Sequence, residues 1–315
     1  MISGRLWLVS PVYKDVEAYV RLRRRALEVL AASQILQHDV RFVVVDDSAG
    51  DDEAIAELKA FTDVTCVPVP FNLGHQRAIV YGLRYLEDQI APEDYIVTLD
   101  SDGEDQPEDI PRMLMPLVTR PAELQRVVVA RRTTRTESLG FKVLYLGFQL
   151  LFRVLTGLVV RSGNFAAFRG WLVRGVLHHP SFDLCYSSTL IGLPLNVEFV
   201  DCARGARYAG RSRMSLRKLI AHGITMLMPF TDQIAVRAMV LFFSTILAAT
   251  LAAVAAVVAR LCWGVRLPSW TTVAIVGVLV CAGVALTNLL VLFAVFSQSN
   301  GLFLHRIETV RNERA

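Results

Sequence analysis

Six carboxylates crowd into the ten residues from Asp100 to Asp109, "DSDGEDQPED", directly after the apolar run "YIVTL". Acids this close repel one another unless a cation or solvent offsets their charge. An Asp-x-Asp pair such as Asp100 and Asp102 at the end of a strand suits Mg²⁺ or Mn²⁺, because these ions take carboxylate oxygens and leave positions open for phosphate oxygens. The plainer alternative is a solvated loop before a helix whose first turn favours acids.

Two further polar stretches occupy equivalent places earlier in the chain. "SPVYKD" contains Pro11, Tyr13 and Asp15, and "VVVDDSAGDD" contains Asp46 and Asp47. Each of them follows an apolar run of strand length. Ligands of parallel α/β sheets bind beyond the carboxyl ends of the strands. The acidic pair alone is a weak signal, but three such loops at matching strand ends predict one binding site.

The elements that position these loops alternate between strand and helix patterns. This alternation predicts βαβ units and an α/β fold with a mostly parallel, Rossmann-like sheet. The predicted strands are 6–10, 41–47, 64–70, 95–100 and 126–132. The predicted helices are 15–30, 54–61, 75–87 and 107–118.

Two long apolar stretches in the last third of the chain, 238–259 and 267–304, contain no charged side chain. At about 1.5 Å per residue, either one can cross the roughly 30 Å hydrocarbon layer as a helix. A pair of buried helices in a large soluble core is the alternative. The opening run of the chain is only strand length, so we expect no cleaved signal peptide.

The basic residues predict how the two spans are oriented. Five precede the first span and three follow the second: Arg211, Arg213, Arg217, Lys218 and Arg237, then Arg306, Arg311 and Arg314. Only Arg260 and Arg266 lie between the spans. The positive-inside rule therefore favours two cytoplasmic termini. We expect a globular domain at 1–235, a two-helix transmembrane hairpin at 236–300 and a cytoplasmic tail at 301–315.

Two further stretches, about 139–160 and 214–230, are apolar but interrupted by basic residues. We interpret them as amphipathic helices at the membrane interface, with buried core helices as the alternative. The five cysteines are odd in number and show no Cys-x-x-Cys spacing. This argues against a disulfide framework and against a zinc site.

Taken together, the motifs resemble those of the GT-A glycosyltransferases of family 2, over residues 5–300. Within that family the chain is similar to the polyprenyl-phosphate glycosyltransferases, such as dolichol-phosphate mannose synthases and bactoprenol glucosyltransferases. "PVYKD" stands for Pro-x-Tyr-Asn-Glu, "VVDDSAGDD" for Asp-Asp-x-Ser-x-Asp, and "DSDGEDQPED" for Asp-x-Asp-x-Gln-x-Pro-Pro-Glu. "FNLGHQRAIVYG" resembles the Asn-x-Gly loop with its helix, and "RYAGRSRMSLRKL" the Arg-x-x-Gly-x-Ser-Lys segment.

The resemblance implies a role for each matched position. It implies that the nucleotide is bound by Pro11, Tyr13, Asp15, Asp46, Asp47 and Asp100. It implies that Mg²⁺ or Mn²⁺ is bound by Asp100, Asp102 and Glu104, where Glu104 replaces the usual Gln. It assigns the acceptor phosphate to Arg207, Ser212 and Arg213. The residues expected to act in catalysis are Asp102, Asn164, Arg207 and Arg213.

The activity that the resemblance implies is a metal-dependent, inverting hexosyltransferase reaction. One sugar would pass from a nucleotide-diphosphate donor, a UDP-sugar in preference to GDP-mannose, to undecaprenyl phosphate at the cytoplasmic face of the inner membrane. The product would serve a cell-envelope glycan. The expected partners are the donor, the lipid acceptor and the membrane, with no nucleic acid. Small residues in the spans would also fit a homo-oligomer.

One departure from the family's motifs bears on the mechanism. "SGNFAAF" places Asn164 where the family has the Asp of Gly-Asp-Phe, a candidate base. A phosphomonoester acceptor is already largely ionised at pH 7 and needs no base, whereas a hydroxyl acceptor benefits from one. The alternatives are a relocated base such as Asp183, or lost activity. Transfer to a lipid or glycan hydroxyl and a non-catalytic, membrane-anchored nucleotide-sugar-binding subunit are the competing functions.

Overall fold

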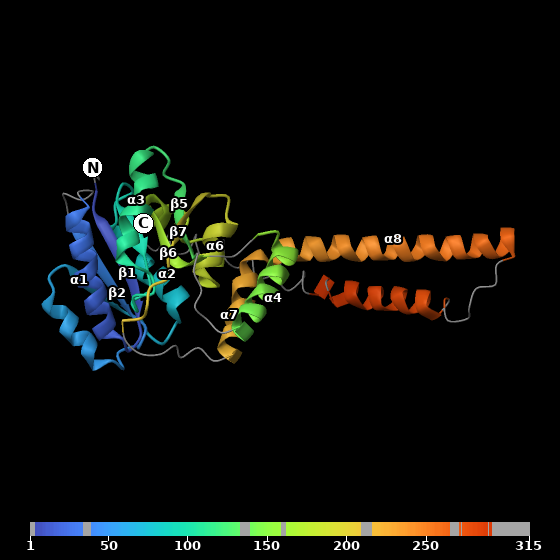
Figure 1. Ribbon diagram of the computed structural model, residues 1–315, viewed down its shortest axis with the longest axis horizontal. Coiled ribbons are helices and arrows are strands. Elements are labelled where there is room, and N and C mark those ends of the chain that lie inside the picture. The colour runs from blue at the N-terminus through green and yellow to red at the C-terminus, as the bar shows by residue number, and fades with distance from the viewer. Residues whose placement is uncertain are drawn as a thin grey trace, which may run out of the picture. The chain divides into compact units, whose positions relative to one another are not determined.

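The computed structural model describes residues 4–33, 39–132, 139–158, 162–208, 216–264, 271, 273–288 and 290–291 (Figure 1). The chain is divided into two compact units. The first consists of Met1–Gln149 with Val159–Pro229, and the second of Leu150–Leu158 with Phe230–Ala315.

A seven-stranded sheet forms the centre of the first unit. Its strands are β1 (Leu6–Val12), β2 (Val40–Asp46), β3 (Val64–Pro68), β4 (Tyr95–Thr98), β5 (Arg126–Arg132), β6 (Ser162–Arg169) and β7 (Asn196–Cys202). They lie in the order β3-β2-β1-β4-β6-β5-β7. All neighbours are parallel except β6, which runs antiparallel to both β4 and β5. The mostly parallel α/β sheet is confirmed, as are its five predicted strands, while β6 and β7 were not predicted.

The helices and 3₁₀ turns fill the connections between the strands. The helices are α1 (Val16–Ala32), α2 (His75–Tyr85), α3 (Ile110–Thr119), α4 (Leu139–Thr156), α5 (Trp171–Gly175), α6 (Tyr186–Gly192), α7 (Leu216–Leu227) and α8 (Thr231–Trp263). The 3₁₀ turns are η1 (Glu53–Ala60), η2 (Glu87–Gln89), η3 (Pro107–Asp109), η4 (Pro180–Asp183) and η5 (Met228–Phe230).

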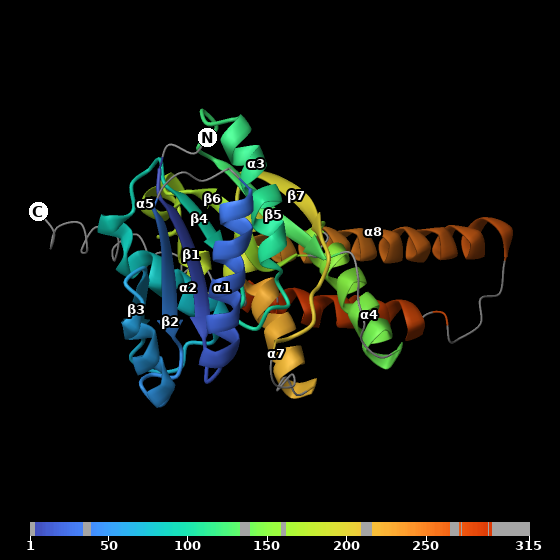
Figure 2. The ribbon, with the colours of Figure 1, turned by 60° about the vertical axis from the view of Figure 1, so that its left-hand side comes forward.

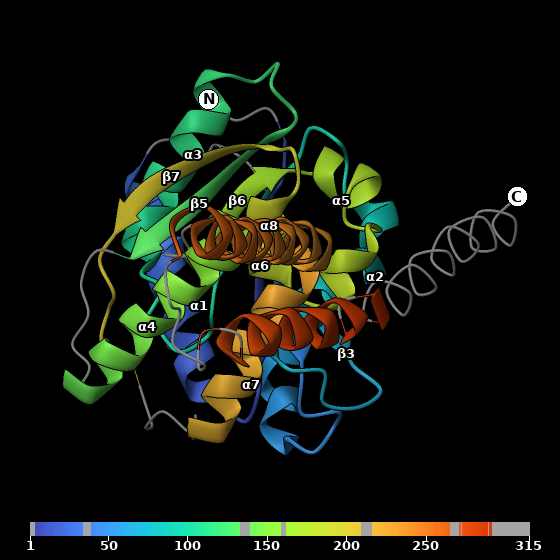
Figure 3. The same cartoon turned by 90° about the vertical axis from the view of Figure 1, so that its right-hand side faces the viewer.

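Alternation along the strands divides the core of the first unit into two layers. Successive side chains of a strand point to opposite faces of its sheet. In β1, Leu6 and Leu8 pack with residues of α1 and α3 on one face, while Trp7 and Val9 pack with residues of α2 and α6 on the other. Figure 2 shows α1 in front of the central strands, and Figure 3 shows β7 beside β5 at the sheet edge. Helices therefore cover both faces of the sheet.

The second unit contains α8, the longest helix of the described residues. Within them, one continuous helical stretch, Ile220–Trp263, is long and apolar enough to cross a membrane, and 6% of its most apolar 18-residue window is buried. A core helix would be mostly buried, so a soluble-core role for this stretch is not supported. Residues 273–288 form a shorter apolar helix. Much of the predicted second span, 267–304, lies outside the described residues, and that span stays a prediction.

Two other helices carry exposed apolar side chains at regular spacing. In α4 these are Leu146, Leu150 and Val154, four residues apart. In α7 and the turn after it they are Ile220, Ile224 and Met228, again four residues apart. Residues at this spacing lie on one face of a helix. Each helix therefore presents an apolar stripe, and the place at the membrane interface predicted for 139–160 and 214–230 stays a prediction.

Candidate functional site

The three polar loops meet at one edge of the sheet because β1 pairs in parallel with both β2 and β4. At the end of β1, the Asp47 N–H donates to the Val12 carbonyl at 2.9 Å. At the end of β4, the Leu99 N–H donates to the Val9 carbonyl at 3.1 Å. The sequence-based prediction that these loops lie together is therefore confirmed.

The first loop turns sharply between β1 and α1. Pro11 is buried in the strand opposite Val45, whereas Tyr13 is 49% exposed. Lys14 has φ = 52°, in the left-handed region that residues other than glycine rarely adopt. Asp15 occupies the position just before α1, and its carbonyl accepts from the Tyr19 N–H at 3.1 Å. The exposed Tyr13 ring is thus available to a ligand at this edge.

The two aspartates of the second loop bind backbone of their own unit. Asp46 Oδ1 accepts from the Ser48 N–H at 3.0 Å and from its hydroxyl at 2.5 Å. Asp47 Oδ1 accepts from the N–H groups of Leu73 and Gly74, at 2.7 and 3.2 Å. Burial raises the pKa of Asp47 even though these two hydrogen bonds lower it. Asp47 therefore fastens the second loop to the segment that leads into α2.

The Asp-x-Asp pair sits in the loop after β4 with its charges only partly balanced. Asp100 Oδ1 accepts from Asn164 Nδ2 at 2.8 Å. Asp102 Oδ1 accepts from the Glu104 N–H at 3.0 Å, and its Oδ2 lies 2.9 Å from Arg207 Nη2. Burial and neighbouring carboxylates raise the pKa of both aspartates to about 6. A cation between them would relieve this repulsion.

Glu104 is held by arginines on both sides of its carboxylate. Its Oε2 accepts from Arg204 Nη2, and its Oε1 accepts from Arg207 Nε at 2.9 Å. Burial alone would raise the pKa of Glu104, but the hydrogen bonds from these two guanidiniums lower it below its ordinary value. Both oxygens of Glu104 are thus engaged by guanidiniums, so a cation would have to displace an arginine to bind it, and its role as a metal ligand stays a prediction.

The carboxylates of the acidic loop suit a metal ion that is bound jointly by the protein and by the phosphates of a substrate. In the part of the chain that the structure describes, no group of three or more His, Cys, Asp or Glu side chains converges on a metal position. Mg²⁺ is commonly held by one or two carboxylates plus substrate phosphates, without an all-protein cage. Asp100 and Asp102, with their raised pKa values, fit such a two-carboxylate site.

The segment after β7 crosses directly over the acidic loop. The Tyr208 N–H donates to the Asp102 carbonyl at 2.9 Å, and the Gly205 N–H donates to the Glu104 carbonyl at 2.8 Å. Gly103 has φ = 85°, and a Cβ atom on it would lie 2.6 Å from the Tyr208 ring. This crossing brings Arg207 to the acids. Ser212 and Arg213 lie outside the described residues.

Asn164 lies in β6 as part of a buried polar cluster. Its side-chain oxygen Oδ1 accepts from Gln76 Nε2, while its side-chain nitrogen Nδ2 donates to Asp100. An uncharged amide in this position holds its neighbours in place and takes no proton. Asp183 is the alternative base, and its Oδ1 lies 2.5 Å from Arg84 Nη1. Arg84 is eight residues after Gln76 in α2, which corresponds to about 12 Å along the helix.

Several residues of the site were not predicted from the sequence. Gln76 and Arg204 are two of them; Asp105 and Arg132 form a further pair, 2.9 Å apart, beside Asp100. Arg204 belongs to the same basic segment as Arg207, which could have indicated it. Gln76 carries no comparable signal, because its partners come from β6 and α6, far away in the sequence.

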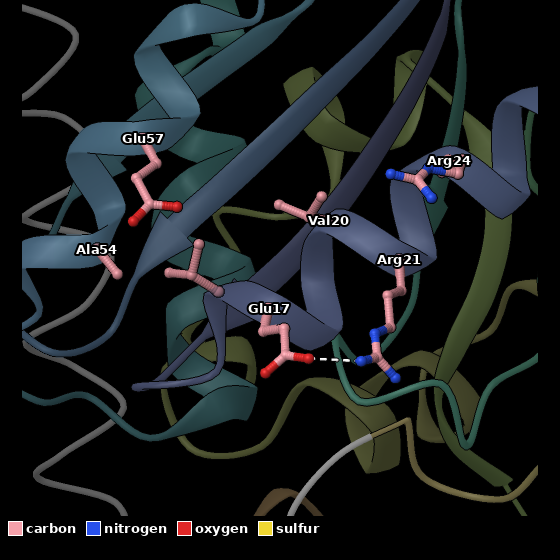
Figure 4. Close-up of a pocket in the computed structure, with 7 residues that line it drawn as sticks. Glu17, Val20, Arg21, Arg24, Ala54 and Glu57 are labelled. Atoms are coloured by element: carbon pink, nitrogen blue, oxygen red, sulfur yellow. Dashed lines mark hydrogen bonds and ion pairs between the residues drawn. The ribbon is translucent and has the colours of Figure 1, made fainter.

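A separate pocket of about 380 Å³ lies between α1 and η1 (Figure 4). Val20, Arg24, Ala54 and Glu57 line it, and Glu17 and Arg21 pair with each other at its rim. None of the Asp-x-Asp loop residues lines this pocket. It is therefore distinct from the site described above.

The sequence matches a known family profile, described as "Glycosyl transferase family 2", over residues 9–173 of its 315. Two curated relatives are both called undecaprenyl-phosphate 4-deoxy-4-formamido-L-arabinose transferase. The one from Pectobacterium carotovorum subsp. carotovorum (strain PC1) is 30% identical, over 68% of this chain and 63% of its own length. The one from Photorhabdus laumondii subsp. laumondii is 28% identical, over 68% and 64%. The chain thus spans somewhat less than two thirds of each relative.

Solved structures with a similar arrangement are more distant. Glucosyl-3-phosphoglycerate synthase from Mycobacterium tuberculosis is 19% identical with a TM-score of 0.44, over 72% of this chain and 80% of that one. Mannosyl-3-phosphoglycerate synthase from Rubrobacter xylanophilus is 14% identical with a TM-score of 0.48, over 73% and 74%.

Proposed function

Because the chain belongs to glycosyl transferase family 2, we propose that it transfers one sugar from a nucleotide-diphosphate donor to undecaprenyl phosphate at the cytoplasmic face of the membrane. The names of the curated relatives support this acceptor. The single observation that carries the proposal is the placement of Asp100 and Asp102 at a strand end, with Arg207 2.9 Å from Asp102. Two carboxylates suited to a cation therefore lie in the loop after β4, beside one guanidinium suited to a phosphate from the segment after β7.

On the donor side, Asp100 and Asp102 would hold Mg²⁺ or Mn²⁺, which neutralises negative charge on the departing diphosphate. Pro11, Tyr13, Asp15, Asp46 and Asp47 would form the nucleotide side of the site. A UDP-sugar is the donor that we propose, and a hexose is the sugar that would be transferred. Of these residues, Tyr13 offers an exposed ring, while Asp47 shapes the loop through its hydrogen bonds to Leu73 and Gly74.

On the acceptor side, Arg207, Ser212 and Arg213 would bind the lipid phosphate. An ionised phosphate oxygen would attack the anomeric carbon with inversion, while the nucleotide diphosphate leaves with the bonding electrons. Asn164 supplies no base, and an acceptor with a second pKa near 6 needs none at pH 7. The guanidinium of Arg207 would stabilise charge in the transition state. Asn164 thus favours a phosphate acceptor over a hydroxyl acceptor.

The membrane part of the proposal follows from the apolar helices. Exposed stripes on α4 and α7 would lie in the interface, and α8 would cross the bilayer. We propose residues 1–235 as the cytoplasmic domain, 236–300 as a hairpin in the inner membrane and 301–315 as a cytoplasmic tail. Small residues such as those of "LAATLAAVAA" would suit contact between copies of the chain.

The test is transfer of label from a panel of nucleotide sugars to undecaprenyl phosphate in membranes containing the protein, with Asp102→Ala as control. We expect a lipid-linked sugar that mild acid releases, and none from the Asp102→Ala protein. An acid-stable product would instead indicate a hydroxyl acceptor. Metal-dependent nucleotide binding without turnover on any acceptor would indicate a binding subunit. Either result would refute the proposal.

A further inference from the structure

A chain of buried amides links three elements to the Asp-x-Asp loop. The Ser187 N–H, at the start of α6, donates to Gln76 Oε1 at 2.8 Å. Gln76 Nε2, in α2, donates to Asn164 Oδ1, and Asn164 Nδ2, in β6, donates to Asp100 Oδ1 at 2.8 Å. Gln76, Asn164 and Ser187 are 8%, 2% and 3% exposed. Water therefore has little access to these bonds, and each polar atom depends on its protein partner.

The direction of this chain is fixed at both ends. A backbone N–H can only donate and an ionised carboxylate can only accept, whereas a carboxamide can do either, depending on how it is turned. Because the Ser187 N–H needs an acceptor, Gln76 must turn its oxygen to α6 and its amide to Asn164. Asn164 must then turn its oxygen to Gln76 and its amide to Asp100. One orientation of both amides satisfies every group.

In this orientation Asn164 donates a hydrogen bond to Asp100 Oδ1, whose negative charge lies close to another carboxylate. The Asp105 Oδ2 atom accepts from the Asp100 N–H at 3.2 Å, so a second carboxylate lies close by. Like charges at this range repel. A donor on Oδ1 favours the ionised form and, together with Arg132 Nη2 at 3.9 Å from Oδ2, restricts the orientation of the carboxylate. Partners behind a ligating carboxylate of this kind set its orientation and basicity.

We propose that Gln76 is a positioning residue: through Asn164 it orients Asp100 to hold the cation that carries a nucleotide diphosphate. The inference rests on the proposed function for its ligand. It also gives Asn164 a purpose of its own. An Asp at this position would place a second acceptor 2.8 Å from Asp100 Oδ1, where the amide now donates. In this chain the hydrogen bond to Asp100 therefore requires the amide of Asn164, and Asn164 is not a lost base.

The test is Mn²⁺-dependent binding of uridine diphosphate, with guanosine diphosphate in parallel, to the full-length protein in detergent, measured by calorimetry. Gln76→Glu keeps the size of the side chain and the acceptor for Ser187, but cannot donate to Asn164. Asn164 should then reverse and turn its oxygen toward Asp100. We expect affinity to fall by about tenfold or more, as for other residues behind a metal ligand.

Gln76→Met is the contrasting variant, because it removes the hydrogen bonds without adding an acceptor. Asn164 can then still donate to Asp100, and we expect affinity to fall by less than about threefold. Thr189→Val is the matched control. It removes buried hydrogen bonds to the Cys185 and Ser181 carbonyls, while the donors and acceptors of Gln76, Asn164 and Asp100 stay in place, and it should bind like wild type.

A purely structural role for Gln76 predicts the opposite order, with Gln76→Met harmed at least as much as the isosteric Gln76→Glu. Equal affinities in the two variants, or a greater loss in Gln76→Met, would overturn the inference. Asn164→Asp gives a second measurement should Gln76→Glu fold poorly. We expect it to lose about tenfold in affinity, and unchanged or tighter binding would also overturn the inference.

The outcomes separate this inference from the proposed function. Wild-type protein that binds a nucleotide diphosphate with Mn²⁺ but transfers no sugar to undecaprenyl phosphate would refute the function and leave the role of Gln76 standing, provided that the variants follow the expected order. Wild-type protein that binds neither nucleotide would refute both.

Discussion

The guanidinium of Arg207 lies against the carboxylate of Asp102, with 2.9 Å between Nη2 and Oδ2. Asp102 is also one of the two carboxylates that suit a cation. An arriving metal ion and Arg207 therefore compete for the same oxygen. Once a cation takes that oxygen, the guanidinium can turn to a phosphate.

From this competition we predict separate effects of Arg207→Ala on binding and on transfer. Binding of Mn²⁺ with a nucleotide diphosphate should stay within about threefold of wild type, because the variant removes a competitor of the metal. Sugar transfer should fall by about 10²–10³-fold, the usual cost of a lost electrostatic stabiliser. Calorimetry and a radiolabel assay measure the two quantities. Loss of nucleotide binding as large as the loss of transfer would place Arg207 on the donor instead.

For Glu104 we predict a loss of stability without a change in metal requirement. Its carboxylate is 14% exposed and accepts from Arg204 and Arg207. Glu104→Ala leaves both guanidiniums without this partner, so the free energy of unfolding should fall by about 2 kcal/mol. The Mn²⁺ concentration for half-maximal nucleotide binding should move by less than about threefold. A rise of tenfold or more would show that Glu104 is a metal ligand.

The raised pKa of Asp100, about 6, predicts a pH-dependent gain in stability for Asp100→Asn. A carboxyl whose pKa is higher in the folded than in the unfolded state stabilises the fold when protonated. That stabilisation is complete below about pH 4 and is lost as the pH rises through 6. Asparagine carries no charge at any pH and keeps an oxygen for the Asn164 amide.

Metal-free Asp100→Asn should therefore unfold about 2–4 °C above wild type at pH 7.5, and the difference should shrink toward pH 4.5. Thermal scans at both values measure it. Substitution of the exposed Asp51 by Asn is the control and should change neither melting temperature. A lower melting temperature for Asp100→Asn at pH 7.5 would contradict the expectation, as would loss of the pH dependence.

The proposed two-span topology predicts which cysteine can be labelled from outside the cell. Cys262 is exposed in the last turn of α8, on the hairpin side of the first span. With both termini in the cytoplasm, a membrane-impermeant maleimide should label Cys262 in intact spheroplasts. It should not label Cys66, in β3, until the cells are opened. Cys262→Ser is the control, and labelling of Cys66 in intact cells would refute the topology.

Strands β1 to β5 could be predicted because each of them is an apolar run that a polar loop ends. β6 gives no such signal: "SGNFAAFR" contains Gly, Asn and Ala, which are poor strand formers. It becomes a strand because β4 and β5 pair with it on both sides. β7, "NVEFVDC", does alternate apolar and acidic residues over part of its length and could have been found.

The candidate site was predictable to the same extent. Asp100, Asp102 and Arg207 stand in motifs whose residue types already indicate cation and phosphate chemistry. The ion pairs of Glu104 depend on two arginines that reach it from a segment about 100 residues away. The position of Gln76 depends on β6, which was not predicted. Contacts of this kind are set by tertiary packing, and spacing along the chain does not reveal them.

The late position of β6 in the chain has a consequence for synthesis. Asn164, the hydrogen-bond partner of Asp100, lies 64 residues further along the chain. At 5–20 residues per second the ribosome needs roughly 3–13 s to synthesise this stretch. Until then β4 lacks its antiparallel neighbour and the acidic loop lacks its amide donor. Arg207 follows later still, and α8 begins 24 residues after it. The ribosome therefore completes the edge of the sheet that carries the candidate site only as it begins α8, the helix that we propose crosses the bilayer.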